Sequence, residues 1–341
     1  MSRHTVRIRN HAIGNGHPVF VVAEIGASHG GKIDRAVKLI EEAAGCGVQA
    51  VKLQTVNVDD SYVGGTESYE IFKGLWFRKE DLERLVKVAE ANHVVLFSTP
   101  GDFCSFGLIR ELKMPLVKIS SGLLTHEPLI KEIAKSGLPI LFSTGMSYLD
   151  EVGSAVRVAE SNGCSDIMLM HCTSLYPAAP ETLNLRAMEA MEAAFPYPVG
   201  YSDHSLGETA AVAACALGAS LIEKHFVLDK AYSGPDSHFS HDPKELKHLV
   251  EEIRNVEKML GSPVKRPTEE EMAIRNRYRR CLVARKVIRA GKRIDRDMVA
   301  VKRVQPGQCG LAPRYYEDIL GLRVRRDINT DEPLLLHHFC D

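Results

Sequence analysis

The sequence predicts an α/β protein, a (β/α)8 barrel followed by a small β-rich domain, and three observations support this prediction. Short apolar runs rich in β-branched residues alternate with longer amphipathic stretches through the first 260 residues. Eight such pairs fill roughly 250 residues, which is the usual size of a (β/α)8 barrel. After Gly261 the alternation gives way to short β-like pieces separated by turns.

Each predicted strand is bounded by glycine, proline or polar residues, which mark its ends. Strand–helix alternation implies a parallel sheet with right-handed crossovers. An open doubly wound sheet is the alternative, but no GxGxxG motif opens a helix after the first strand. The predicted strands are 19–25, 50–54, 94–98, 116–120, 140–143, 167–171, 199–202 and 221–225.

The stretches between the strands have the periodicity of amphipathic helices. Between residues 80 and 92, for example, Leu82 and Leu85 belong to one apolar stripe, with a charged face opposite. The same pattern predicts helices over 126–136 and 149–162, each followed by a glycine that can end a helix.

The C-terminal part differs in both organisation and charge. The barrel is expected over residues 1–262, a linker with a short charged helix over 263–279, and the β-rich domain over 280–341. Although the net charge of the chain is −1, residues 265–326 hold 18 Lys and Arg against 7 Asp and Glu. This asymmetry suggests an anionic ligand or an acidic surface against which the segment docks. Nucleic acid is a weaker explanation, because aromatic residues are few and no zinc-finger, RRM or KH pattern is present.

Cysteine usage and the absence of export signals indicate a cytoplasmic protein. The eight cysteines form no CxxC pair, which is typical of buried thiols in a reducing cytosol. An iron–sulfur or structural zinc site would need paired spacing. No apolar run reaches the roughly 20 residues of a membrane-spanning helix, and the first residues lack the apolar core of a signal peptide.

A polar residue stands at the carboxyl end of nearly every predicted strand. In a (β/α)8 barrel these ends meet at the face that carries the active site. One polar strand end is unremarkable, but a series of them predicts a single site. The series comprises Glu24, Lys52, Gln54, Ser98, Thr99, Lys118, Ser121, Ser143, His171, Ser202, Asp203, His204, Glu223 and His225.

Two histidines of this series are candidate metal ligands. His204 and His225 end the seventh and eighth predicted strands, so their rings should be neighbours. Two neutral imidazoles can hold a divalent metal and leave positions open for water and substrate. The alternative is that each is a hydrogen-bonded loop histidine, although the adjacent Asp203 and Glu223 favour a metal. His171 is a third candidate ligand, or a residue that orients the site.

Two lysines predict an anion site. Lys52 and Lys118 lie within otherwise apolar strands, and an ammonium group buried in a barrel requires an anion or a carboxylate partner. A Schiff-base lysine is the competing interpretation, but it needs a lowered pKa. Glu24 can act as a general base, accept from a sugar hydroxyl or form a salt bridge with Lys52. The hydroxyls that would complete a phosphate cradle belong to Thr99, Ser121, Ser143 and Ser202.

With these residues located, the chain resembles the sialic acid synthase family (N-acetylneuraminate and other nonulosonate synthases), in which a metal-dependent barrel is followed by an antifreeze-like (SAF) domain. The resemblance covers nearly the whole chain. It rests on nine blocks in order: AEIG (23–26), VKLQT (51–55), FSTP (97–100), KISSG (118–122), STGM (143–146), HCTSLYP (171–177), GYSDHS (200–205), EKHF (223–226) and GPD (234–236).

The resemblance implies an enzyme that condenses phosphoenolpyruvate with an N-acylated hexosamine, releasing phosphate and a nine-carbon 3-deoxy-2-ulosonic acid. It assigns Mn²⁺ or Mg²⁺ to His204 and His225. It further implies that Lys52 and Lys118, with the hydroxyls of the predicted cradle, bind the donor. The residues that match its sugar site or proton-transfer positions are Glu24, Gln54, Ser174, Tyr176 and Asp236.

The resemblance also implies a domain-swapped homodimer in which Arg303 reaches the N-acyl group of the sugar. Some positions depart from the family pattern: Leu123 replaces a glutamate, Ser174 an asparagine and Val304 a proline. These departures lie at the sugar end, so the reaction type is better defined than the sugar, which includes phosphorylated candidates. A non-catalytic carbohydrate- or phosphate-binding protein is the alternative function. An ice-binding protein is disfavoured, because the C-terminal part is rich in arginine.

Overall fold

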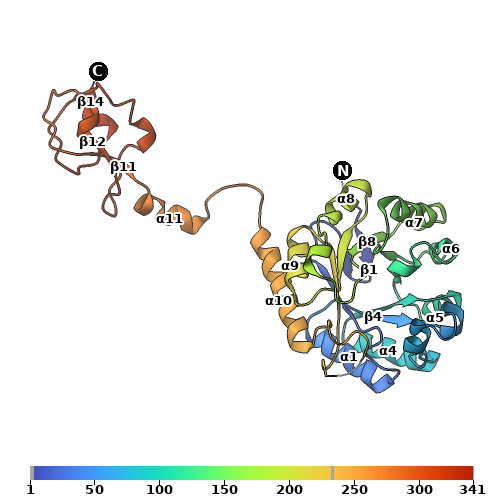
Figure 1. Cartoon of the computed structure of the whole chain (residues 1–341). Coiled ribbons are helices and arrows are strands. Elements are labelled where there is room, and N and C mark those ends of the chain that lie inside the picture. The colour runs from blue at the N-terminus through green and yellow to red at the C-terminus, as the bar shows by residue number, and fades with distance from the viewer. Residues whose placement is uncertain (1–3, 232–233, 341) are drawn as a thin grey trace. The chain divides into compact units, whose positions relative to one another are not determined.

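The computed structural model describes residues 4–231 and 234–340 and confirms the predicted architecture (Figure 1). The chain divides between Gly261 and Ser262 into two compact units, each described by itself below. In the first unit, eight parallel strands form a closed barrel in which β10 pairs with β3 and each intermediate strand pairs with its neighbours in sequence. The second unit contains short antiparallel strand pairs.

The eight barrel strands correspond to the eight predicted ones. The barrel closes where β10 lies beside β3, with His225 opposite Glu24, and the next pairing sets Glu24 opposite Lys52. This register brings the polar strand ends level with one another. The strands are β3 Phe20–Glu24, β4 Ala50–Thr55, β5 Val95–Pro100, β6 Val117–Ile119, β7 Ile140–Ser143, β8 Ile167–Cys172, β9 Val199–Asp203 and β10 Leu221–His225.

One principal helix follows each strand, as the periodicity predicts. The connection after β4 also contains two short helices, α2 Val58–Ser61 and α3 Glu67–Phe72. The longest helix, α10 (Pro243–Leu260), is capped by Asp242, whose carboxylate accepts from the backbone N–H of Glu245 in a capping box. The principal helices are α1 Ile33–Gly45, α4 Lys79–Ala91, α5 Phe103–Glu111, α6 Glu127–Lys135, α7 Leu149–Ser161, α8 Ala187–Ala194, α9 Thr209–Ala216 and α10 Pro243–Leu260.

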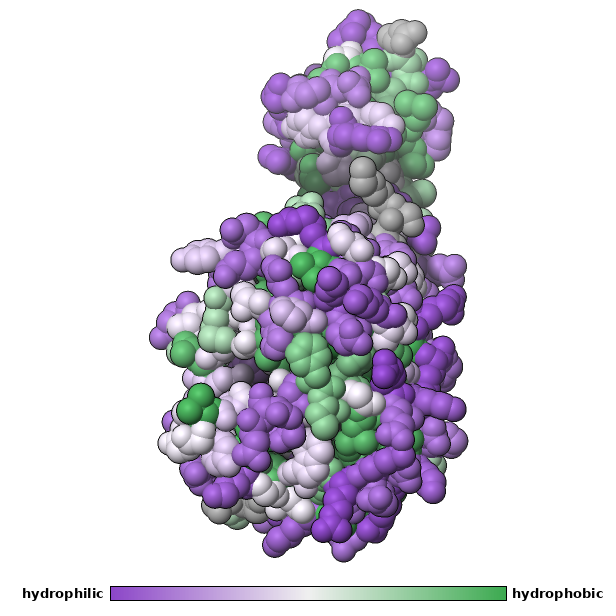
Figure 2. All heavy atoms as spheres, turned by 90° about the vertical axis from the view of Figure 1, so that its right-hand side faces the viewer, coloured by the Kyte–Doolittle hydropathy of each residue, from purple (hydrophilic) through white to green (hydrophobic). Residues whose placement is uncertain are grey.

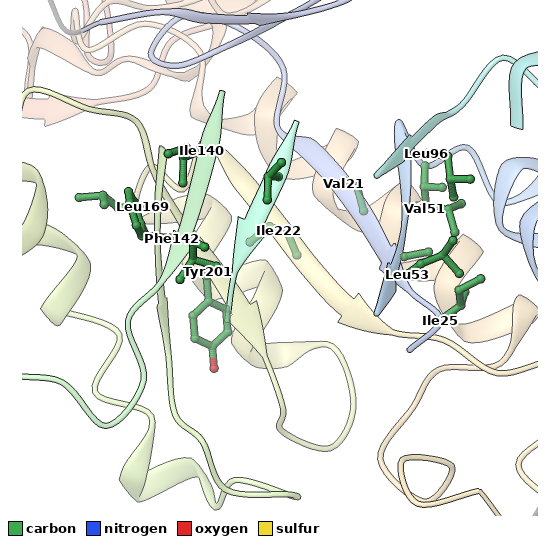
Figure 3. Packing of buried hydrophobic residues seen from close by; sticks show 14 of the residues in the cluster. Val21, Ile25, Val51, Leu53, Leu96, Ile140, Phe142, Leu169, Tyr201 and Ile222 are labelled. Atoms are coloured by element: carbon green, nitrogen blue, oxygen red, sulfur yellow. The ribbon is translucent and has the colours of Figure 1, made fainter. Parts of the chain in front are cut away.

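Alternation along the strands divides the core of the barrel unit into two parts. Outward side chains such as Val51, Leu169 and Tyr201 pack against the helices, and Figure 3 shows members of this cluster projecting from the strands. Inward side chains such as Val22 and Met170 fill the interior of the barrel. A strand residue therefore faces either the helices or the interior, and a shift of one position reverses its side.

A hairpin closes the interior at the amino ends of the strands. Strands β1 (Val6–Ile8) and β2 (His11–Ile13) pair antiparallel, and Val6, Ile8 and Ile13 belong to the same buried cluster as the first inward residues of the barrel. Because apolar side chains fill this end, the polar strand ends face the opposite opening.

The second unit begins with helix α11 (Glu269–Tyr278), which Thr268 caps through its hydroxyl. Strands β11 (Cys281–Ala284) and β12 (Val299–Lys302) pair antiparallel, as do β13 (Arg323–Val324) and β14 (Phe339–Cys340). Apolar side chains from across this unit form its own small core, which includes Leu282, Ile288, Val299, Val324 and Leu334.

The visible face of the barrel unit is largely polar (Figure 2), and most of the cysteines lie beneath the surface of the protein. Hydrophilic residues cover much of the face of the barrel unit that Figure 2 shows, with smaller hydrophobic groups between them. Five of the cysteines are buried thiols as expected, and Cys340 is half-buried. The prediction is wrong for Cys104, in the first turn of α5, and for Cys309, in a loop, because both positions are exposed. Among the described residues, no helix is long and apolar enough to cross a membrane.

Candidate active site

Four charged side chains occupy the barrel interior at its polar end. Lys52 forms an ion pair with Glu24 from the neighbouring strand, and its Nζ lies 3.9 Å from Glu223 Oε1. Lys118 Nζ donates to the same Glu223 oxygen at 2.5 Å. All four side chains are at most 5% exposed. Two ammonium groups and two carboxylates therefore lie together, out of contact with solvent.

The charges of this cluster depend on one another. Burial alone would lower the pKa of Lys52, but the carboxylates of Glu223 and Glu24 reverse this effect and raise it. For Lys118 burial prevails, and its pKa is lowered despite the attraction of Glu223. Burial would raise the pKa of Glu223, but the two ammonium groups hold it well below its usual value. An anion that enters this region meets lysines already paired with carboxylates.

Hydroxyl groups surround the charged cluster. Thr99 Oγ1 lies 3.5 Å from Lys52 Nζ, and Ser202 donates to Glu223 Oε1 at 3.1 Å. After β6, Ser121 accepts from the backbone N–H of Gly145 at 3.0 Å. Ser143 is also buried and faces the interior from the end of β7. The structure thus brings together all four hydroxyls of the predicted cradle, although in two groups.

Gln54 connects the charged cluster to the opening of the barrel. Its Nε2 donates to Glu24 Oε1 at 3.3 Å. Gly26, two residues after Glu24 at the end of β3, has a left-handed backbone with φ 22°. A Cβ there would lie 2.6 Å from Glu24 Oε1 and 3.2 Å from Gln54 Nε2. Only glycine lets the chain turn this close to the carboxylate.

The rings of His204 and His225 are neighbours, with centroids 5.4 Å apart. His204 Nδ1 lies 2.8 Å from the carbonyl oxygen of Thr173, so Nδ1 carries the proton and Nε2 keeps its lone pair. Burial, reinforced by His225, lowers the pKa of His204 to about 4. The imidazole is therefore neutral at pH 7, as a metal ligand must be.

Aromatic and acidic side chains line the region beside these rings. Tyr176 lies over His204 with 4.3 Å between ring centroids, and Phe239 is 4.9 Å from His225. Asp236 Oδ2 is 3.5 Å from His225 Nδ1. Burial would raise the pKa of Asp236, but the interaction with His225 lowers it overall.

Two expectations about strand ends are wrong for the same geometric reason. His171 faces outward, where its Nε2 lies 2.7 Å from the carbonyl oxygen of Leu183, so it is not a third ligand beside the other histidines. Asp203 also faces the helix side and pairs with Lys224 at 2.8 Å. Both residues alternate with inward side chains, Cys172 and Ser202.

The remaining predicted residues are placed as follows. Ser174 Oγ is buried without a hydrogen-bond partner, and Leu123 packs against the outer apolar cluster. Arg303 belongs to the second unit, where its guanidinium lies 5.1 Å from the centroid of the Tyr278 ring.

The sequence placed Glu223 among the strand-end residues but did not predict its pairing with both lysines, and it assigned no role to Cys172 or Phe239. A strand-parity rule finds Glu223 and Cys172, because each lies two residues from another inward position. Glu223 precedes His225 by two, and Cys172 follows Met170 by two. No sequence signal distinguishes Phe239 from other loop aromatics.

Comparison with known proteins identifies the same architecture. Residues 39–265 match the model of the NeuB family, and residues 279–339 match that of the SAF domain. An uncharacterised protein of Methanocaldococcus jannaschii is 41% identical over 96% of both chains. The N,N'-diacetyllegionaminic acid synthase of Legionella pneumophila is 35% identical over 95% of this chain and 96% of its own. The N-acetylneuraminic acid synthetase of Leptospira borgpetersenii, solved with citrate, shares 31% identity and a TM-score of 0.76 over 80% of this chain and 95% of its own.

Proposed function

The chain belongs to the NeuB family, with a SAF domain behind its barrel, and on that premise we propose that it condenses phosphoenolpyruvate with an N-acylated hexosamine. The products are inorganic phosphate and a nine-carbon sialic-acid-type 3-deoxy-2-ulosonic acid. The observation that carries the proposal is the buried group of Lys52 and Lys118, among hydroxyls and beside the neutral His204, at the polar end of the barrel.

The donor is proposed to bind through the two lysines. Phosphoenolpyruvate carries a carboxylate and a phosphate, so two separate ammonium groups match its two acidic ends. Thr99 and Ser202 flank Lys52 and Glu223, while Ser121 and Ser143 contact Cys172 at the ends of β6 and β7. These hydroxyls can donate to the oxygens that the lysines do not reach. Amine catalysis is less well supported: burial lowers the pKa of Lys118, as it requires, but the Lys118 ammonium is held by Glu223 and the Lys52 ammonium by Glu24.

The sugar is proposed to bind nearer the opening. Glu24 and Gln54 are hydrogen-bonded to each other and present polar atoms beside Lys52. Tyr176 is about half exposed, so one face of its ring is available to a sugar. Asp236 has a carboxylate pKa below its usual value and can accept from a hydroxyl. Ser174 lies where this region meets the Ser121 and Cys172 side chains, and its buried hydroxyl has no hydrogen-bond partner among the described residues.

His204 and His225 fit a divalent ion. His204 presents a free Nε2 lone pair. The buried Nδ1 of His225 makes no hydrogen bond among the described residues, and its nearest acidic neighbour is Asp236 Oδ2 at 3.5 Å. No group of three His, Cys, Asp or Glu side chains arranged to hold an ion occurs among residues 4–231 and 234–340. Two imidazoles would therefore leave the other positions to water and substrate. Mn²⁺ or Mg²⁺ held there would supply Lewis-acid polarisation of the sugar carbonyl oxygen.

The atoms of the reaction balance without a further cofactor. The methylene carbon of phosphoenolpyruvate forms a bond to the sugar aldehyde carbon, whose oxygen takes a proton and becomes a hydroxyl. Water adds to C2 of the donor, and the C2–O bond to phosphate breaks as inorganic phosphate leaves. The chain's own contribution is to fix both acidic ends of the donor and to exclude bulk water from the interior.

A homodimer in which Arg303 serves the partner's site is part of the proposal. Two features support it: the C-terminal part is basic while the remainder is acidic, and exposed apolar side chains, Met146, Tyr148, Leu175 and Leu206, follow β7, β8 and β9 near the polar end. An Arg303→Ala variant should raise the KM for the sugar without changing that for phosphoenolpyruvate. A fully active monomer by light scattering would contradict this arrangement.

The activity is tested by phosphate release from phosphoenolpyruvate with Mn²⁺ across a panel of sugars. The panel contains N-acetylmannosamine, its 6-phosphate, and N-acylated precursors of legionaminic and pseudaminic acid, the products named for two groups of relatives. We expect turnover with at least one sugar and a product heavier than that sugar by the added three-carbon unit. Binding of phosphoenolpyruvate by calorimetry with no turnover on any sugar would favour the non-catalytic binding protein.

A further inference from the structure

A thiol lies within contact of two hydroxyls of the predicted cradle, those of Ser121 and Ser143. Cys172 Sγ is 3.1 Å from Ser121 Oγ and 3.5 Å from Ser143 Oγ. Cys172 ends β8 on the inward side and is 4% exposed. None of the comparisons assigns this cysteine a role, and its buried thiol contacts both hydroxyls of one half of the cradle.

A second observation shows that this pocket is built around polar atoms. A Cβ added to Gly145 would lie 2.2 Å from Ser174 Oγ, 2.9 Å from Cys172 Sγ and 2.9 Å from Ser121 Oγ. These three atoms therefore converge on one point beside the Gly145 backbone. The hydroxyl of Ser174 is buried there without a hydrogen-bond partner. A buried unsatisfied hydroxyl is costly in a folded protein, so its presence points to a ligand that satisfies it.

The chemistry of sulfur explains why a thiol is suited to this position. A thiol is a weak hydrogen-bond donor and a weak acceptor. Ser121 already accepts from the Gly145 N–H, but no strong acceptor for the proton of Ser121 or Ser143 occurs among the described contacts. Cys172 therefore holds the two oxygen atoms in place without binding their protons firmly. Both hydroxyls remain free to donate to an anionic oxygen.

We propose that Cys172 is a positioning residue of the donor site, which orients Ser121 and Ser143 toward one acidic group of phosphoenolpyruvate and is covered when the donor binds. This inference rests on the proposed function and adds to it. It names the group that arranges the hydroxyls and predicts that a small thiol reagent and the donor compete for one place.

The first experiment measures modification of each cysteine in the full-length protein with methyl methanethiosulfonate. The thiolate forms a new S–S bond, methanesulfinate leaves, and the thiol proton passes to the buffer. Saturating phosphoenolpyruvate should slow modification of Cys172 at least tenfold, as followed by peptide mass spectrometry. The exposed Cys104 and Cys309 serve as internal controls whose rates should stay the same. Dithiothreitol should remove the methylthio group and restore donor binding.

The second experiment compares two variants that each remove a buried thiol. Cys172→Ala should raise the KM and the calorimetric Kd for phosphoenolpyruvate about three- to tenfold, the range expected for loss of one hydrogen-bonding group. The KM for the sugar should change less than twofold, which a general loss of structure would not produce. Cys164→Ala removes a thiol buried in the outer cluster and should leave donor affinity unchanged.

The outcomes separate this inference from the proposed function. If calorimetry detects no phosphoenolpyruvate binding to the unmodified protein, the proposed donor is wrong. If the donor binds but modification of Cys172 proceeds at the same rate, the donor lies elsewhere and the inference is overturned. If the reagent does not reach Cys172 at all, the Cys172→Ala affinity decides, and an unchanged Kd overturns the inference.

Discussion

The barrel interior and the SAF unit place charged residues in opposite environments. In the barrel, Lys118 and Glu223 pair with each other, and their side chains are 5% and 2% exposed. In the SAF unit, Arg296 and Glu317 pair with each other, and their side chains are 70% and 64% exposed. Both are ion pairs between similar residue types, with N–O distances of 2.5 and 2.8 Å.

The two environments differ in how much an ion pair contributes to the stability of the fold. Exposed pairs contribute little to stability, because solvent and salt screen them. Buried pairs lose their hydration, and an apolar replacement of similar volume is often equally stable. The buried charges of the barrel are therefore not explained by stability alone. A cluster of perturbed ionisable groups at the polar end of a barrel is instead typical of a site for chemistry.

The largest effect is expected from the histidines of the barrel. His204→Ala should reduce turnover to background, because its free nitrogen is a ligand of the proposed ion. Exhaustive chelation of the unmodified enzyme should do the same, and Mn²⁺ should restore activity. In the SAF unit, the side chain of His337 is exposed, and His337→Ala should leave turnover unchanged. Full activity after chelation, with residual metal measured by mass spectrometry, would refute the role of the ion.

A smaller but still large effect is expected from the buried lysines. Lys118→Met should lower kcat/KM by about 10³-fold or more, the scale for losing an electrostatic group that stabilises the transition state. It should also destabilise the barrel by about 3–5 kcal/mol, because Glu223 is left as a buried charge without its closest partner. Initial rates and urea unfolding, followed by the single tryptophan, Trp76, measure the two effects.

A double variant separates these two consequences. Lys118→Met combined with Glu223→Gln removes both charges and should recover most of the stability but none of the activity. Lys286→Met breaks the exposed pair with Asp297 in the SAF unit and is the matched control. Recovery of turnover in the double variant would show that Lys118 acts only by neutralising Glu223.

The sequence predicted the barrel well because its information is local. Each strand shows an apolar run and each helix a periodic stripe, so eight repeats determine the architecture. The same regularity located Lys52 and Lys118. It failed for His171, because a one-residue difference in strand parity exchanges the interior for the helix side.

The pairings inside the site could not be predicted. Lys118 and Glu223 are 105 residues apart, and no spacing rule connects them. Lys118 lies on β6 and Glu223 on β10, which are not neighbours in the sheet, so the two side chains meet only because the closed barrel brings them together in its interior. The same holds for Cys172, whose contacts with Ser121 and Ser143 come from three different strands or their ends.

Buried histidines should make the barrel unit sensitive to acid. Burial, followed by the charge of Arg35, lowers the pKa of His29 to about 4 in the folded chain. In the unfolded chain the pKa is near 6.5. The stabilisation is therefore complete above pH 6.5 and is lost as the pH falls toward 4, because only the unfolded state then binds the proton. The loss for this histidine is about 3 kcal/mol.

This prediction is measured by urea unfolding of the barrel at several pH values, again with Trp76 as the reporter. His29→Gln keeps a polar side chain that does not titrate, and it should reduce the dependence on pH by one proton. His204 and His241, whose pKa values burial also lowers to about 4, should preserve the remaining slope. An unchanged slope in the variant would show that His29 is protonated to the same extent in both states.

The smallest effect is expected where the SAF unit is altered at its surface. Arg296→Ala removes the pair with Glu317, and it should change the free energy of unfolding by less than about 1 kcal/mol. The effect should shrink further at high salt, because the pair lies in solvent within reach of counterions. Amide hydrogen exchange over residues 281–340 measures this unit separately from the barrel. A loss as large as that of Lys118→Met would mean that the pair is shielded from solvent in the assembled protein, as a dimer interface over this surface would require.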